Sequence, residues 1–228
     1  HNTELYDALA HSRQITPLLV THEGGGAFMA DAFSRLNWGG IGAEGAARAI
    51  GTLAIVPAAG LTHAASGIGE AYLAGVPMLV LTGGTRTDSG RRYQLHGIDQ
   101  LEMARGFTKA AFRVMTHEQV VPTLFEAYRI ATSDVPGPVL VELPVNLQIF
   151  TGDAGKLPAW QSPEPPALPD AALVRQAADV LLQARQAGLF VGWGARGAQV
   201  ELMELAELLQ MPVSTTLQGL AVFPGNHP

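Results

Sequence analysis

The sequence predicts an α/β protein whose main domain is a doubly wound parallel sheet. Short, nearly continuous apolar runs alternate with longer stretches in which apolar residues recur at helical spacing. Strands of this kind are buried on both faces, which indicates a parallel sheet that helices cover on either side. A proline-rich stretch near residue 160 interrupts this pattern, and a shorter strand, helix and strand pattern follows it.

The predicted strands of the first domain are short enough to cross a sheet once. They lie at residues 18–20, 53–56, 78–81 and 139–141. Between residues 120 and 131, Val120, Leu124, Ala127 and Ala131 share one face, which predicts a helix that packs on the sheet.

Residues 151–169 predict a connector, because proline at their density favours an extended chain over packed structure. We therefore expect a first domain at residues 1–150 and a partial second domain at 170–228. In the second domain Asp170 is a predicted N-cap of a helix that ends at Gly188. The elements expected next are a strand at 189–191, a helix at 199–210 and a strand at 212–216. These strands are too few for a domain of their own, so we expect the chain to end within one.

The composition argues against several classes of partner. The chain has 228 residues, a net charge of -6 and only 14 lysines and arginines, so we expect neither nucleic acid nor an anionic membrane as a partner. It has no cysteine, which excludes disulfides and thiolate chemistry. Its apolar runs fall short of the roughly 20 residues of a membrane helix. The chain begins at His1 with no readable targeting segment, and we expect it to be a piece of a longer protein.

The most informative motif is an apolar run that ends on an acid. Residues 17–23 read Pro-Leu-Leu-Val-Thr-His-Glu, and three glycines follow before a helical stretch begins. A strand that delivers the carboxylate of Glu23 to its tip, beside glycines that allow close backbone approach, is suited to meeting a ligand. The alternative is that Glu23 only caps the helix, where the helix dipole favours a carboxylate.

This segment resembles the His-Glu-x-Gly-Ala-x-x-Met-Ala stretch of thiamine-diphosphate enzymes of the acetolactate synthase type. Other segments resemble the same family in the same order, and together they extend over nearly the whole chain. They are residues 2–9, 69–80, 137–144 and 215–220. The resemblance implies a pyrimidine-binding domain that lacks its opening strand and helix, followed by a partial Rossmann-like middle domain. It also implies that Glu23 is the catalytic carboxyl group that hydrogen-bonds to the cofactor's aminopyrimidine.

A second landmark of the family is a tight turn that approaches the cofactor, usually Ser-Gly-Pro-Gly-x-Thr-Asn. Here it reads Pro57-Ala58-Ala59-Gly60-Leu61-Thr62-His63, so the resemblance implies that Gly60, Thr62 and His63 bind cofactor. His63 replaces the family's asparagine, and a titratable imidazole in this turn could change which substrate is accepted.

A third landmark implies substrate contacts. Alignment on Thr108-Lys109 places His96 where the family has a glutamine, and Gln100 follows in the same segment. Both are predicted on the substrate side, although a histidine is more often a structural residue. Residues 86–92 are basic enough to recognise an anion, with a solvated loop as the alternative.

The second domain carries Gly-x-Gly-x-x-Gly at residues 192–197, between a predicted strand and helix. The acid that would confirm a dinucleotide site is missing from the end of the next strand, which argues against NAD. In acetolactate synthases this turn and a Thr-Leu-Gln-Gly segment lie along FAD, so the resemblance implies contacts from Thr216, Leu217 and Gln218. A relict site without flavin is the alternative.

The resemblance implies an enzyme that decarboxylates a 2-oxo acid such as pyruvate and transfers the two-carbon unit to an acceptor. A simple decarboxylase, an acyl-transferring relative and a non-catalytic nucleotide-binding or assembly module stay open as alternatives. The family binds its cofactor between subunits, which implies a homodimer or homotetramer. A cytoplasmic location is expected as well. The chain offers no metal ligands of its own, and Mg²⁺ is expected on a domain beyond residue 228. The glycine-rich residues 36–51 are expected to form an inserted surface loop, or else a lid over the cofactor.

Overall fold

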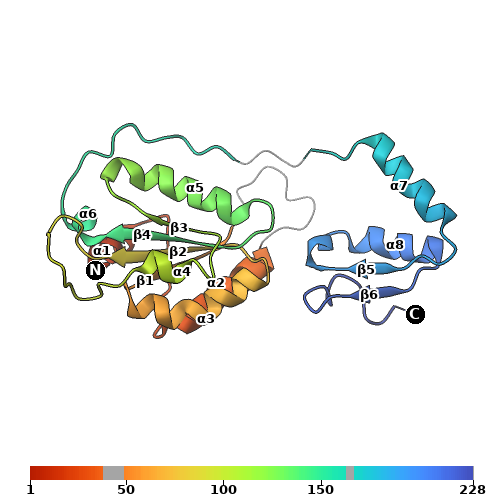
Figure 1. Ribbon diagram of the computed structural model, residues 1–228, viewed down its shortest axis with the longest axis horizontal. Helices are drawn as coiled ribbons and strands as arrows, with labels where there is room; N and C mark the ends of the chain where they lie inside the picture. The colour runs from red at the N-terminus through yellow and green to blue at the C-terminus, as the bar shows by residue number, and fades with distance from the viewer. Residues whose placement is uncertain (38–48, 163–166, 228) are drawn as a thin grey trace. The chain divides into compact units, whose positions relative to one another are not determined.

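Four parallel strands form the sheet of the first unit, in the order β1-β2-β4-β3 (Figure 1). The computed structural model describes residues 1–37, 49–162 and 167–227. The strands are β1 (Gly51–Ile55), β2 (Met78–Gly84), β3 (Ala110–Arg113) and β4 (Pro138–Pro144). Three of the four runs predicted as strands lie in β1, β2 and β4, and each of these pairs in parallel with its neighbour.

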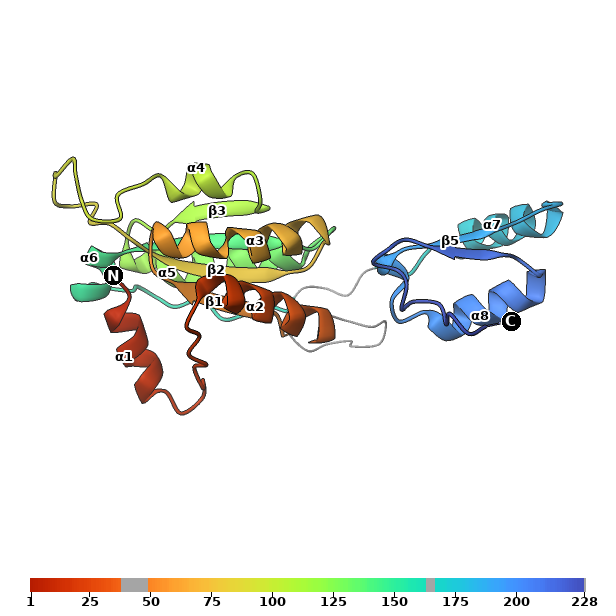
Figure 2. The same ribbon diagram turned by 90° about the horizontal axis from the view of Figure 1, so that it is seen from below.

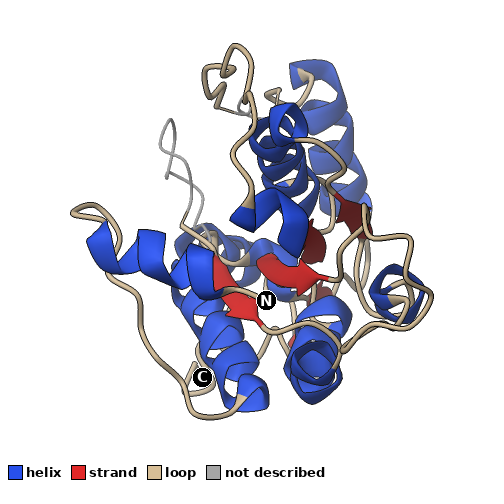
Figure 3. Cartoon of the chain, turned by 90° about the vertical axis from the view of Figure 1, so that its left-hand side faces the viewer, coloured by secondary structure: helices blue, strands red, loops and turns tan. Residues whose placement is uncertain are grey.

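Helices cover both faces of this sheet, as the doubly wound prediction requires (Figures 1 and 3). One face carries α2 (Glu23–Asn37), α3 (Ala59–Leu73) and α4 (Gln100–Ala104), and the other carries α5 (Val120–Thr132). The side chains of β4 alternate between the two cores: Leu140 packs with α2 and α3, whereas Val139 and Val141 pack with α5. The predicted fold class is confirmed.

The remaining elements of this unit are short and lie around the sheet. They are α1 (Thr3–His11), the three-ten helix η1 (His117–Gln119) and α6 (Val145–Ile149). The first helix, α1, lies outside the helix and sheet layers, at the end of the sheet where α6 also lies (Figure 2). Residues 12–22 lead from α1 back to α2.

The strand predicted at residues 18–20 is wrong. These residues pair with none of the described strands, and the side chains of Leu18 and Leu19 are 74% and 92% exposed. An apolar run becomes a strand only where a neighbouring strand accepts its hydrogen bonds, and β1 is the edge of this sheet with β2 as its neighbour. Glu23 therefore reaches its position as the first residue of α2 rather than at the tip of a strand.

The second unit is a small βαβ structure. Strands β5 (Leu189–Val191) and β6 (Val213–Thr215) pair in parallel, with α8 (Gln199–Leu209) between them in sequence. The three-ten helix η2 (Trp193–Ala195) lies in the glycine-rich turn after β5. These elements match the predicted strand, helix and strand in order and, within two residues, in extent.

Helix α7 (Ala171–Gln183) is capped as predicted but packs differently. The carboxylate of Asp170 accepts a hydrogen bond of 2.6 Å from the backbone N–H of Ala172. The helix ends at Gln183, before the predicted stop at Gly188, and none of its residues is buried. Its apolar face is therefore uncovered among the described residues.

The chain divides between Gln161 and Ser162, inside the predicted connector. The connector has no helix or strand among its described residues, and most of them are exposed. Trp160 is an exception, because its ring lies edge-on to Phe125 and Tyr128 of α5 at 5.0 and 5.1 Å. The limits of the two domains at residues 150 and 170 stay predictions.

Most of the glycine-rich segment at 36–51 lies outside the described residues. No helix in the described part of the chain is long and apolar enough to cross a membrane.

Candidate functional site

The start of α2 brings Glu23 and His22 to one end of the first unit. Glu23 is the first residue of α2, where the helix dipole favours a carboxylate. The ring of His22 accepts a hydrogen bond of 3.1 Å from the backbone N–H of Gly24, which satisfies one of the free N–H groups of the first turn. His22 therefore serves as the local cap, and the carboxylate of Glu23 is left to make other contacts.

The start of α3 is set by a tight turn after β1. Gly60 is buried in the first turn of α3, and a Cβ on it would lie 3.1 Å from Cγ2 of Val56 and 3.2 Å from Cβ of Ile55. A side chain here would push α3 away from the end of β1. The hydroxyl of Thr62 donates to the carbonyl of Ala59 at 2.9 Å and lies on the exposed side of the helix.

The two helix starts meet at Glu23 and His63. The imidazole Nδ1 of His63 lies 3.1 Å from Oε2 of Glu23, forty residues away in sequence. The rings of His63 and His22 stack, with centroids 5.4 Å apart and planes 20° apart. The side chains of Glu23 and His63 are 28% and 54% exposed, so the pair is open to a ligand. The structure thus joins two residues that the sequence assigned to one site.

The surroundings of Glu23 favour its ionised form. A hydrogen bond with its own backbone N–H lowers the pKa of the Glu23 carboxyl below its ordinary value of 4.5, and the hydrogen bond with His63 lowers it further. Partial burial opposes both effects but does not reverse them. Glu23 is therefore a hydrogen-bond acceptor near neutral pH.

His96 lies apart from this pair. Its backbone has a φ of 67°, and its ring lies edge-on to that of His1 at 5.1 Å. Among the described residues it contacts neither Glu23 nor His63, so its role toward substrate stays a prediction.

Gln100 has a structural position that the sequence did not reveal. Its side chain is in the interior, 2% exposed, and bonds to the backbone N–H of Ala58, the hydroxyl of Thr82 and the carboxylate of Glu142. Direct contact with substrate stays a prediction for this residue, and its observed contacts are with the protein.

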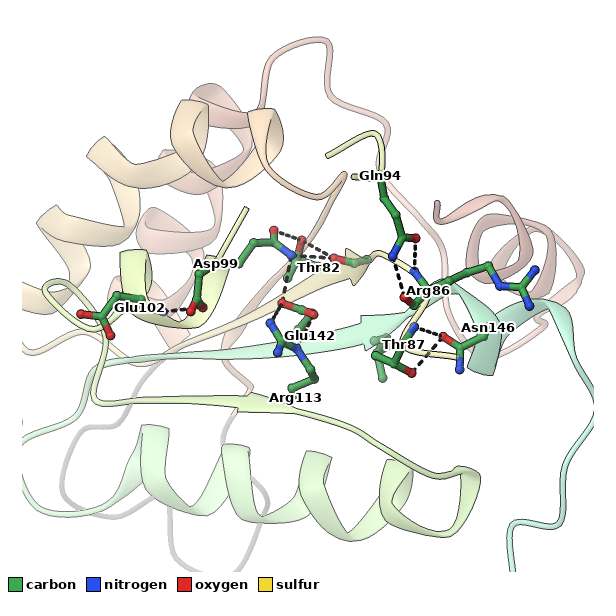
Figure 4. A network of polar contacts seen from close by, with 12 residues as sticks. Thr82, Arg86, Thr87, Gln94, Asp99, Glu102, Arg113, Glu142 and Asn146 are labelled. Carbon is green, nitrogen blue, oxygen red and sulfur yellow. Dashed lines mark hydrogen bonds and ion pairs between the residues drawn. The ribbon is translucent and has the colours of Figure 1, made fainter. Parts of the chain in front are cut away.

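The basic segment at 86–92 is folded back on itself. The guanidinium of Arg86 forms two hydrogen bonds with Asp88, at 2.8 and 2.9 Å. The side chain of Gln94 bonds to the backbone of Arg86, as Figure 4 shows. Asn146 of α6 accepts from the backbone N–H of Thr87 at 3.1 Å. The charge of Arg86 is already neutralised by Asp88, which favours the reading of a solvated loop.

In the second unit, Thr216 lies beside the glycine-rich turn. Its backbone N–H donates to the carbonyl of Val191 at 2.9 Å, and its hydroxyl accepts from the N–H of Gly219 at 3.0 Å. Leu217 and Gln218 follow it on the surface, with Leu217 81% exposed. These residues lie after the carboxyl end of β6, where ligands of open parallel sheets bind. Contacts with FAD stay a prediction.

Two models of one protein family match this chain. The N-terminal TPP binding domain of thiamine pyrophosphate enzymes matches residues 1–103, and the central domain of the same enzymes matches residues 174–228. The chain belongs to the thiamine pyrophosphate enzymes. The first match contains Glu23, Gly60, His63 and Gln100, and the second contains residues 216–218.

Several acetolactate synthases resemble nearly the whole chain. Acetolactate synthase isozyme 3 large subunit of Escherichia coli is 30% identical over 98% of this chain and 38% of its own length. Acetolactate synthase 1 of Oryza sativa is 30% identical over 99% of the chain and 34% of its own length. A probable acetolactate synthase large subunit of Methanocaldococcus jannaschii is 31% identical over 98% and 37%. The chain thus spans little more than a third of the length of these relatives.

No group of three or more potential metal ligands lies together in the described residues.

Proposed function

We propose that this chain is the cofactor-activating part of a thiamine-diphosphate enzyme that decarboxylates a 2-oxo acid and transfers the two-carbon unit, as an acetolactate synthase does. The observation that carries the proposal is the approach of Glu23 to His63. It brings together the start of α2 and the start of α3, the two segments that the family resemblance assigns to the cofactor.

The residues at this point fit an aminopyrimidine. Glu23 is ionised and partly exposed, so its carboxylate accepts a hydrogen bond from a protonated ring nitrogen. His63 already bonds to Oε2, so a ligand nitrogen uses Oε1 or replaces the imidazole. Both outcomes keep a charge-assisted hydrogen bond on the same carboxylate.

Thiamine diphosphate supplies a carbon nucleophile and accepts the electron pair that remains when carbon dioxide leaves the 2-oxo acid. The part of this chain is narrower. Glu23 would hold a proton at the pyrimidine nitrogen, and the backbone of residues 57–63 together with His63 would lie beside that nitrogen. The glycine-rich turn and residues 216–218 would bind FAD if a flavin is present. The proposal also holds that the full-length protein uses Mg²⁺, forms a homodimer or homotetramer, and is located in the cytoplasm.

The product of the full-length protein separates the alternatives. With thiamine diphosphate, Mg²⁺ and pyruvate, the proposal expects release of carbon dioxide together with acetolactate. Acetaldehyde in place of acetolactate would indicate a simple decarboxylase. Binding of FAD without any release of carbon dioxide would favour a non-catalytic module and contradict the proposal.

A further inference from the structure

The carboxamide of Gln100 has no unused hydrogen-bonding capacity. Its oxygen accepts from the backbone N–H of Ala58 and lies at the same 3.0 Å from the hydroxyl of Thr82. Its nitrogen donates to the carbonyl of Gly83 at 2.9 Å and to the carboxylate of Glu142 at 3.1 Å. An amide has two acceptor positions and two donors, and a protein group lies within hydrogen-bonding distance for each of the four; the hydroxyl of Thr82 shares its one proton between Gln100 and the carbonyl of Gly83. Because these hydrogen bonds are made in the interior, Gln100 links parts of the protein to one another and is not a polar residue of the surface.

The contacts of Gln100 join separate elements at one end of the sheet. Ala58 precedes α3, Thr82 and Gly83 end β2, and Glu142 lies in β4. Gln100 itself is the first residue of α4, and its place there is fixed by Asp99, whose carboxylate accepts from the N–H of Glu102 at 3.1 Å (Figure 4).

An ion pair fixes which way the amide points. Arg113 of β3 donates to Glu142 at 2.7 Å, and the Glu142 side chain is only 4% exposed (Figure 4). The carboxylate accepts hydrogen bonds, so it faces the amide nitrogen of Gln100. The amide oxygen is then directed at the N–H of Ala58, which can only donate. Gly84 leaves room for this arrangement, because a Cβ on it would lie 2.6 Å from Oε1 of Glu142.

The backbone of Ala58, whose N–H donates to Gln100, is strained. Ala58 has φ 58° and ψ -90°, which is close to the rare γ-turn conformation and unfavourable for a residue with a Cβ. Such a conformation persists only where its surroundings hold it. In the described part of the chain, the side chain that bonds to the backbone N–H of Ala58 is that of Gln100.

The conformation of Ala58 sets the start of α3. The carbonyl of Ala58 accepts the first hydrogen bond of the helix, 3.0 Å from the N–H of Thr62. His63 is the next residue, and its ring meets Glu23. A change in the turn at Ala58 would therefore move His63 relative to the carboxylate.

We propose that Gln100 is a positioning residue, which holds the strained turn at Ala58 and thereby keeps His63 opposite Glu23. The link to catalysis rests on the proposed function, whereas the link to the Glu23 and His63 pair does not. In this proposal Gln100 acts through the backbone of Ala58, and its side-chain contacts in the structure are with the protein.

The test measures Glu23 itself, in the absence of any cofactor. Carbon-13 NMR of the 228-residue chain would follow the titration of the Glu23 carboxyl in the parent, in Gln100→Met and in His63→Ala. Because His63 lowers the pKa of Glu23, its removal raises that pKa toward the ordinary value. Gln100→Met is expected to raise it in the same direction and by a similar amount. The matched control is Thr82→Val, which removes another partner of the same amide oxygen and should leave the Glu23 titration unchanged.

A Gln100→Met variant that titrates like the parent would overturn the proposal. If that variant does not fold, Gln100→Asn gives the same decision, because its amide is one methylene too short to reach both Ala58 and Glu142. In the full-length enzyme, Gln100→Met should lower turnover at saturating cofactor on the order of tenfold to hundredfold, the scale of a misplaced catalytic group. A changed titration in a protein that shows no thiamine-dependent activity would sink the proposed function and leave the positioning role standing.

Discussion

The imidazole Nδ1 of His63 lies 3.1 Å from the carboxylate of Glu23, and the ring of His22 stacks on that of His63. Two helix starts are therefore joined by a side-chain contact at the point where the chain is expected to meet its cofactor. The contact makes Glu23 the residue whose substitution is most informative.

Glu23→Gln should leave the fold intact and remove most of the activity. The amide keeps the size of the side chain but is neither ionised nor able to take up a proton. Loss of an acid or base function typically lowers rates by about 100-fold or more. Exchange of the C2 proton of thiamine diphosphate in the full-length protein measures this effect directly, with thermal unfolding as the control for folding. Unchanged exchange would remove Glu23 from the mechanism.

Acid should weaken the first unit partly through Glu23. Its folded pKa lies below its ordinary value of 4.5, so its contribution to stability is complete above that value. As the pH falls from 4.5 through the folded pKa, the unfolded chain takes up the proton first and the contribution is lost. Denaturant unfolding measured over this pH range should have a smaller slope against pH in His63→Ala than in the parent. Equal slopes would mean that the imidazole does not stabilise the ionised carboxylate.

Ala58→Gly should stabilise the chain. A glycine tolerates φ 58° and ψ -90° without the steric cost that a methyl group brings, and relief of such strain is worth about 1 kcal/mol or more. The midpoint of urea unfolding should rise with an unchanged slope. The control is Ala65→Gly, in the interior of α3, which should destabilise by roughly 0.5 to 1 kcal/mol. A loss of stability in Ala58→Gly would refute the claim of strain.

Lys109→Met should destabilise the end of α5. The Nζ of Lys109 donates to the carbonyls of Ile130 and Ser133 at 2.6 and 2.7 Å, and it completes hydrogen bonds that the last turn of a helix leaves open. Burial lowers the pKa of Lys109. Methionine keeps an unbranched apolar side chain at this position and removes the ammonium group that donates the two hydrogen bonds. We expect a loss of about 1.5 to 3 kcal/mol, the scale of a hydrogen bond from a charged group. Lys156→Met, at an exposed position of the connector, is the control and should change stability little.

The elements that sequence could predict are those whose burial is local. Val139, Leu140 and Val141 are apolar in succession because helices cover both faces of β4, and that pattern is visible in the residues alone. The run at 18–20 has the same pattern and is not a strand, since pairing depends on a neighbour that the run itself cannot specify. The sequence shows that a run is apolar enough to be buried, but it does not show whether a neighbouring strand pairs with that run.

The candidate site divides in the same way. Glu23, Gly60 and His63 were predicted from the motifs in which they lie, and the structure adds that Glu23 and His63 touch. The role of Gln100 was out of reach, because its partners come from three separate elements that only the folded chain brings together. In the sequence, Gln100 is only a glutamine beside the N-cap residue Asp99, and nothing there indicates its buried hydrogen bonds.

Trp160 gives the connector an optical reporter. Its ring packs on Phe125 and Tyr128 and so senses whether the residues just before Gln161 remain on α5. Trp193 lies in the other unit, under the guanidinium of Arg196 at 4.6 Å. The chain has a third tryptophan, Trp38, which these variants must also replace. Fluorescence from variants that keep only Trp160 or only Trp193 would then follow the two halves of the chain separately, and it would show whether they unfold in one step or in two.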